Sequence, residues 1–279
     1  MSHTTDMQSP LPYSLEEIKT GLVLTVDKPV GWTSFQVVNK LKWQIRRQYG
    51  LSKFKIGHAG TLDPLASGLL LVCVGPATKQ IEALQQGEKV YTGTMVLGAT
   101  TPCFDRERPV DRLFPVAHFD EASLHAQAAR MTGPLQQLPP TFSAVKVDGR
   151  RAYAAARSGD DVALKPKEVT LYDFRLTAFR PGQPVWQSAT LGLLSTAQPT
   201  SERELYRQPR CVVPDWLPQL DFEVRCSKGT YIRSLARDFG DALHTGAFLA
   251  SLRRHRIGTF DLSHAIRLAA DDAKTDAIC

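Results

Sequence analysis

Apolar residues along the chain fall mostly into short runs and alternations, a pattern typical of β-strands. Residues 69–74 are apolar at every position and predict a buried strand. Leu220, Phe222, Val224 and Cys226 alternate with charged residues and predict a half-buried strand. Strands are predicted over residues 22–26, 69–74, 91–98, 169–179, 220–226 and 259–262. Because they do not alternate regularly with helices, we expect an α+β fold, with a largely antiparallel mixed sheet flanked by helices.

A spacing of three to four residues between apolar positions predicts a helix that begins after an N-cap at Thr33 or Ser34. Its opposite face carries Lys40, Trp43 and Arg47. A basic face that includes an aromatic residue can contact phosphates and stack a base. It can equally be a solvated face with a cation–π pair. The apolar stripe of this helix consists of Phe35, Val38, Leu41, Ile45 and Tyr49.

Two more helices are predicted. Asp120 is expected to cap a helix that runs to about Met131, and the segment 227–233 is expected to lead into another helix. The apolar face of that last helix consists of Ile232, Leu235, Ala236, Phe239 and Leu243.

The segments around these elements differ in composition. Residues 57–68 contain three glycines and one proline and are expected to be irregular. Residues 138–151 are expected to form a loop with short strands around a turn at Asp148–Gly149. The whole chain is expected to comprise a polar leader (1–20), one domain (21–266) with a proline-rich insertion (181–218) that holds one strand near 186–194, and an acidic tail (267–279).

Composition and charge exclude several classes of protein. The chain has 43% hydrophobic and 22% charged residues, as soluble globular proteins do. Its longest apolar run, 69–74, is far shorter than the roughly 20 residues of a spanning helix. The first 20 residues lack the apolar stretch of a secretory signal, which predicts a cytoplasmic protein. The five cysteines are widely spaced, without a C-x-x-C, and support neither a disulfide framework nor a zinc site. The net charge of +6 suits a polyanionic partner.

Asp63 is the first candidate for chemistry. It precedes Pro64, which disfavours the helical conformation and leaves Asp63 in a turn or extended segment. Loops of this kind can present a side chain to a substrate. A carboxylate there can act as nucleophile, general acid–base or metal ligand, or it can simply form an Asx turn.

The string GHAGTLDPLASG at 57–68, which contains Asp63, resembles the catalytic loop of the TruB-type tRNA pseudouridine synthases. Further blocks resemble the same family in the same order, and the resemblance covers about residues 20–262. These blocks are DKPVGWTS (27–34), KVY (89–91), PP (139–140), SAVK (143–146), RRAY (150–153), CSKGTYIR (226–233) and LRR (252–254).

The resemblance implies a pseudouridine synthase fold and an RNA uridine isomerase that needs no metal and no cofactor. Asp63 would be the essential carboxylate, a nucleophile that adds to C6 or attacks C1′, or a base that removes a ribose proton. Tyr91 matches the active-site tyrosine, which can stack on a flipped uracil. Arg233 matches an arginine that pairs with the catalytic aspartate and favours its charged form.

The resemblance also implies residues that bind the substrate. Tyr231 matches a pocket residue, Leu252 an apolar wall, and His58 a histidine that contacts RNA around the flipped nucleotide. Lys28 and Lys89 would support the loop or contact RNA. The candidates for phosphate contacts are Arg253 and Arg254, with Arg256, Arg150 and Arg151.

The expected substrate is the T-loop uridine that becomes pseudouridine 55 in tRNA, bound through the T arm by a monomer. An RNA-binding chaperone of tRNA folding and a synthase with another RNA target are alternatives. A carboxylate glycosidase would need a second acid, which the Asp63 loop does not supply. Family members often continue into an RNA-binding module of the PUA type, which is not expected here. The segment 98–105, with Pro102 and Cys103, also departs from the family pattern.

Overall fold

The computed structural model divides the chain into two compact units, Met1–Tyr91 with Arg253–Cys279 and Thr92–Leu252. The single domain predicted over residues 21–266 includes parts of both. The structure describes residues 10–116, 119–143, 146–147, 150–151, 164–182, 213–214 and 216–268. Most of the predicted insertion with its strand near 186–194, the turn at Asp148–Gly149 and the tail from 269 lie outside these residues.

The first unit is built on strands in the order β13-β1-β3-β12, with β2 paired to β3. Strand β1 pairs antiparallel with β3 and parallel with β13. Its elements are α1 (Leu15–Thr20), β1 (Leu22–Lys28), α2 (Ser34–Tyr49), β2 (Ile56–Ala59), β3 (Ala66–Val74), the 3-10 helix η1 (Gly75–Gln80), α3 (Ile81–Leu84), β13 (Ile266–Arg267), the start of β4 (Lys89–Leu97) and the end of β12 (Ala247–Ile257).

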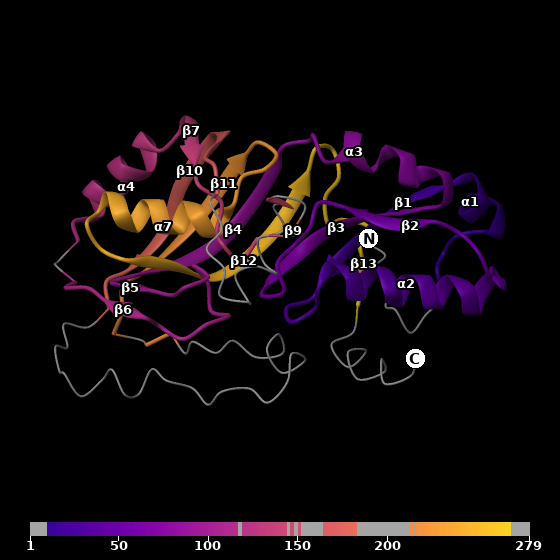
Figure 1. Cartoon of the computed structure of the whole chain (residues 1–279), viewed down its shortest axis with the longest axis horizontal. Helices are drawn as coiled ribbons and strands as arrows, with labels where there is room; N and C mark the ends of the chain where they lie inside the picture. The colour runs from indigo at the N-terminus through magenta and orange to yellow at the C-terminus, as the bar shows by residue number, and fades with distance from the viewer. Residues whose placement is uncertain are drawn as a thin grey trace. The chain divides into compact units, whose positions relative to one another are not determined.

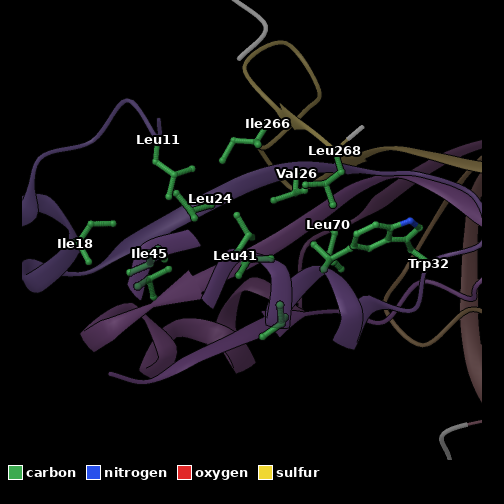
Figure 2. Close-up of a cluster of buried hydrophobic side chains, with 14 residues drawn as sticks. Leu11, Ile18, Leu24, Val26, Trp32, Leu41, Ile45, Leu70, Ile266 and Leu268 are labelled. Carbon is green, nitrogen blue, oxygen red and sulfur yellow. The ribbon is translucent and has the colours of Figure 1, made fainter. Parts of the chain in front are cut away.

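Helix α2 begins as predicted, at the N-cap Thr33, whose side chain forms a capping box with Gln36. It packs on β1 and β3, and Figure 2 shows Leu41 and Ile45 within this core. The prediction for Phe35 is wrong, because its side chain is 66% exposed. At 100° per residue Phe35 lies about 100° away from the mean direction of the buried residues. The buried apolar residues are Val37, Val38, Leu41 and Ile45.

The prediction of a polar leader is wrong for residues 10–20. This segment contains helix α1, capped by Ser14, and it buries Leu11 and Ile18 in the same core as Leu24 of β1 (Figure 2). The helix is only six residues long and contributes one buried residue, so it leaves almost no periodic signal in the sequence.

The second unit holds strands in the order β12-β4-β11-β10-β7. Helices α4 and α7 lie beside β10 in Figure 1. Phe174 of β10 contacts Phe239 of α7 and Phe222 of β11 edge to face, at ring-centroid distances of 5.8 Å and 5.9 Å. The further elements are β5 (Ala99–Thr100), β6 (Arg112–Leu113), α4 (Glu121–Arg130), β7 (Gly133–Gln137), β8 (Lys146–Val147), β9 (Arg150–Arg151), β10 (Lys167–Arg180), β11 (Gln219–Cys226) and α7 (Ile232–Ala242).

The predicted fold class is confirmed. Strands β1, β3, β4, β10 and β11 lie where the hydrophobic pattern places them, and Asp120 caps α4. Apart from the parallel β1–β13 pair, the ladders with a known register among the described residues are antiparallel. The strand predicted over 259–262 is wrong, because a tight turn joins Ile257 to Phe260 there and the last strand is β13. Within the described residues, no helix is long and apolar enough to span a membrane.

Candidate active site

The loop with Asp63 is shorter than predicted. Residues 57–59 belong to β2 and residues 66–68 to β3, so only Gly60–Leu65 connect the two strands. Gly68, near the start of β3, has a φ of +99°, which glycine adopts without strain, and it packs against the backbone of Arg254. A Cβ atom on Gly68 would lie 2.2 Å from the carbonyl oxygen of Arg254. At Gly68 the sequence signal for an irregular segment therefore reflects the close approach of β3 and β12 and not a long loop.

Hydrogen bonds from the start of α2 fix the loop on both sides of Asp63. The buried Ser34 hydroxyl accepts from the Leu62 amide at 2.9 Å and lies 3.1 Å from the Leu62 carbonyl, to which it donates. The Gly31 amide donates to the Pro64 carbonyl at 2.8 Å. Because the residues on either side of Asp63 are held, the backbone of Asp63 has little freedom.

Lys28 is buried beneath this loop, with no exposed surface. Its ammonium group donates to the carbonyls of Trp32 at 2.7 Å, Pro29 at 2.9 Å and Pro64 at 3.3 Å. Burial lowers the pKa of Lys28 to about 7, although the negative charge of Asp63 opposes this shift. Of the two roles predicted for Lys28, this geometry supports the loop and not contact with RNA.

Arg254 is also buried, at 2% exposure, and the prediction that it contacts phosphates is wrong. Its guanidinium donates to the carbonyl of Gly60, at the start of the loop, at 2.9 Å and to that of Leu69, in β3, at 2.8 Å. Its neighbour Arg253 forms an ion pair with Asp27 at 2.7 Å, with 37% of its side chain exposed. Arg253 therefore remains open to a further anion, and its phosphate contact stays a prediction.

Three more candidates belong to the first unit. His58 lies on β2, where burial and the nearby positive charge of Arg254 lower its pKa. It is therefore predominantly neutral at pH 7. Lys89 and Tyr91 lie on β4 with mostly buried side chains, and Lys89 donates to the carbonyl of Gln85. The burial of Lys89 favours a structural role over contact with RNA.

The second unit holds Arg233 and Tyr231 at the start of α7. Arg233 is buried and donates to the carbonyls of Cys103 at 3.1 Å and Phe142 at 2.9 Å. The carboxylate of Asp105 lies 3.8 Å from its Nε atom. Cys103 and Asp105 belong to the segment that departs from the family pattern, and that segment is packed here, with Cys103 fully buried.

Gln137, at the end of β7, holds the backbone of Tyr231. Its amide oxygen accepts from the Tyr231 amide at 2.7 Å, and its nitrogen donates to the Tyr231 carbonyl at 3.1 Å. The Ser234 hydroxyl adds a bond to the carbonyl of Leu138 at 2.8 Å. These bonds stabilise the helix start that carries Arg233. The side chain of Leu252, on β12, is half-buried.

The candidate residues are thus divided between the two units. Asp63, Lys28 and Arg254 lie around one loop of the first unit, and Tyr231 and Arg233 lie on one helix start of the second. The pairing of Arg233 with Asp63 stays a prediction. Sequence reasoning missed the supporting residues Ser34, Gln137, Asp27 and Asp105, because each hydrogen-bonds or pairs with a residue distant in sequence. For Ser34, its place at the first position of a helix was a usable signal.

Comparisons with known proteins identify the family of this chain. The model of the family described as "TruB family pseudouridylate synthase (N terminal domain)" matches residues 46–192. The chain is 44% identical to "tRNA pseudouridine synthase B" of Flavobacterium johnsoniae, over 90% of this chain and 94% of that protein. It is 42% identical to the protein of the same name from Phocaeicola vulgatus, over 89% of this chain and 90% of that protein. It is also 42% identical to the one from Thermobifida fusca, over 88% of this chain and 72% of that protein.

Solved structures show the same fold. A chain of a Cbf5-Nop10-Gar1 complex matches 90% of this chain with a TM-score of 0.56 and 24% identity. A chain of an H/ACA RNP bound to a substrate RNA containing 2′-deoxyuridine matches 92% with a TM-score of 0.54 and 23% identity. This chain spans about half the length of either match, 53% and 54%. With the family model covering more than half of its residues and close relatives covering nine tenths, this chain belongs to the TruB family of pseudouridylate synthases.

Proposed function

We propose that this protein converts uridine to pseudouridine in tRNA, at position 55 of the T loop. The observation that carries the proposal is the Asp63 loop, whose backbone carbonyls accept hydrogen bonds from Lys28, Ser34 and Arg254. A carboxylate on a fixed turn can meet a reacting atom without a cost for ordering the loop. The name shared by the relatives supports tRNA as the substrate.

The reaction balances within one nucleotide. The bond from N1 to C1′ breaks, the uracil rotates, and a bond from C5 to C1′ forms. C5 loses its proton and N1 gains one, so no oxidant or group acceptor is consumed. In this proposal Asp63 is the nucleophile or base, Tyr91 stacks on the flipped uracil and helps to remove the C5 proton, and Arg233 favours the charged carboxylate.

The target uridine must leave the base stack before Asp63 can reach it, so the proposal includes base flipping. Tyr231 and Leu252 would line the uracil pocket, and His58 would contact RNA beside it. The protein would act as a cytoplasmic monomer on the T arm.

The test is incubation with unmodified tRNA, followed by mapping of pseudouridine at single-nucleotide resolution. We expect one product at position 55 and none on a tRNA with cytidine at that position. Pseudouridine elsewhere would identify another RNA target. Faster folding of tRNA with no pseudouridine would identify a folding chaperone.

Asp63→Asn should abolish product formation and leave tRNA binding within about threefold of wild type, because the amide keeps the shape of the carboxylate and loses its nucleophilicity. Single-turnover rates and filter binding measure the two quantities. A turnover within tenfold of wild type would remove Asp63 from the chemistry.

A further inference from the structure

The positive charge of the chain is concentrated in one segment. Residues 29–62 contain six lysines and arginines and no aspartate or glutamate. The other 28 basic residues equal the 28 acidic ones, so this segment accounts for the whole net charge of +6. Its cations lie on α2 and on the connection to β2, and are Lys40, Lys42, Arg46, Arg47, Lys53 and Lys55.

Trp43 lies among these cations on α2, with 52% of its surface exposed. The Lys40 ammonium lies 5.4 Å from the centre of its ring, and the Arg47 guanidinium carbon lies 5.2 Å from it. Both distances are typical of cation–π contacts, so the cation–π pair predicted for this face is present. About half of the Trp43 surface remains exposed beside these cations.

Phe35 is exposed on the same helix, eight residues before Trp43. Two exposed aromatic side chains are thus separated by about 12 Å along the helix axis. Neither is needed to hold α2 in place, because the opposite side of the helix packs through Leu41 and Ile45 (Figure 2). We call Phe35, Lys40, Trp43 and Arg47 the α2 outer face.

We propose that the α2 outer face binds an unpaired segment of RNA, with one base stacked on Trp43 and phosphates at Lys40 and Arg47. Positive grooves with exposed aromatic side chains bind single strands in this way, because every base has a stacking face. The proposal rests on the proposed function only in assuming that RNA is the physiological partner. It adds a contact that does not involve the Asp63 loop.

RNA fits this surface better than a protein does. Lysine is depleted at the centre of protein interfaces, whereas here lysines and arginines surround the aromatic residue. The segment also lacks carboxylates that would repel a phosphate chain. An anion beside Trp43 would be attracted by Lys40 and Arg47, which lie against its ring.

The first experiment measures binding of a short fluorescent oligoadenylate, which contains no uridine, to the full chain by fluorescence polarisation. Trp43→Ala should weaken binding at least about fivefold, the loss of one stacked base. Trp43→Phe should recover most of the affinity. The double variant Lys40→Gln/Arg47→Gln should make the slope of log K against log[salt] shallower by about 1.4, since two phosphate contacts are lost.

A matched control is Tyr172→Ala. Tyr172 is an exposed aromatic residue with Arg225 at 5.1 Å, but Asp173 lies beside it and it does not belong to the basic segment. Its loss should leave oligoadenylate binding unchanged. Thermal unfolding midpoints within a few degrees of wild type will show that each variant is folded.

Three results would overturn the proposal. In the first, Trp43→Ala binds oligoadenylate as wild type does. In the second, Tyr172→Ala weakens oligoadenylate binding as much as Trp43→Ala does. In the third, oligoglutamate of equal charge displaces the RNA as well as RNA itself does, which would favour an acidic protein partner. Pseudouridine formation on tRNA is measured in parallel. If no pseudouridine forms but oligoadenylate affinity depends on Trp43, the proposed function is rejected and this inference is kept. If pseudouridine forms but the Trp43 variants bind oligoadenylate as wild type does, this inference is rejected and the proposed function is kept.

Discussion

Two of the candidate side chains, Lys28 and Arg254, are basic and nevertheless buried. Lys28 donates to the Pro64 carbonyl of the Asp63 loop and Arg254 to the Gly60 carbonyl, so these bonds join the loop to β1 and β12. The sequence predicted phosphate contact for Arg254 and either loop support or RNA contact for Lys28, because a sequence does not show where a lysine or arginine points. At the residue scale, the sequence pointed to candidate residues but did not predict the contacts that each side chain makes.

Replacing Lys28 by methionine should destabilise the fold by at least about 2 kcal/mol, because three carbonyls lose a buried donor. The effect should grow with pH. Burial lowers the pKa of Lys28 to about 7 in the folded state, against 10.5 when unfolded. Between these values the unfolded chain binds more protons, so wild-type stability rises with pH across this window and the variant lacks that rise.

Urea unfolding of both proteins between pH 7 and 10 measures this difference. Lys19→Met provides the control, because Lys19 is an exposed lysine of α1 in the same unit. It should change the free energy of unfolding by less than about 0.5 kcal/mol. A difference between wild type and Lys28→Met that does not vary with pH would show that Lys28 keeps an ordinary pKa.

Tyr91 allows the stacking and the chemistry to be separated. Tyr91→Phe keeps the ring and loses the hydroxyl, so RNA should still bind while turnover falls at least about a hundredfold, within the usual contribution of a general base. Tyr91→Leu should weaken both. Binding and single-turnover rates on tRNA measure the two effects. Near-full activity of the phenylalanine variant would leave Tyr91 with a packing or stacking role alone.

At the scale of elements, the first turn of α2 couples a helix to the candidate catalytic loop. Thr33 caps the helix through Gln36, and Ser34 binds both polar groups of Leu62. Thr33 therefore stabilises the helix, whereas the adjacent Ser34 stabilises the Asp63 loop.

This arrangement predicts different consequences for two neighbouring substitutions. Thr33→Ala should cost about 1 kcal/mol of stability through the lost cap, with turnover unchanged. Ser34→Ala should cost about 1–3 kcal/mol and also slow turnover, since the residue before Asp63 loses its anchor. Thermal unfolding and single-turnover rates compare the pair. Equal rates in both variants would show that Asp63 does not depend on this anchor.

Elements were predictable where one face of a strand or helix is buried. β11 alternates regularly, and β3 is apolar throughout, so both follow from the sequence. The failures have local causes. α1 is too short to show a hydrophobic period, β13 has only two residues, and Gly68 lies in a strand that approaches the backbone of Arg254. The reactive residues of the candidate site are predictions from a family resemblance, whereas supports such as Ser34 and Gln137 depend on partners far along the chain.

At the scale of the whole molecule, the candidate chemistry and the charge are distributed differently. Asp63 and Tyr91 belong to the first unit and Arg233 to the second. The net charge lies in residues 29–62 of the first unit. A polyanion would therefore be attracted most strongly to residues 29–62, whereas the proposed chemistry also uses Arg233 of the second unit.

This distribution leads to a prediction about the minimal substrate. The residues proposed to contact the flipped uridine, among them His58 and Tyr91, can cover a loop and its adjacent base pairs. RNA is recognised chiefly through loop shape and splayed bases, with phosphates for position. An isolated T-arm stem-loop should therefore be converted to pseudouridine, and full-length tRNA should be bound more tightly because longer RNA provides more phosphates to the basic segment.

The measurement compares pseudouridine yield and KM on the stem-loop and on full-length tRNA, with a uridine-to-cytidine stem-loop as control. Raising the salt concentration should narrow the difference in KM, since the additional contacts of the longer RNA are electrostatic. Efficient reaction on tRNA with none on the stem-loop would contradict recognition of the T arm alone. It would place essential contacts on RNA outside that arm, and the Trp43 variants would then be the first to examine for a loss of turnover on tRNA.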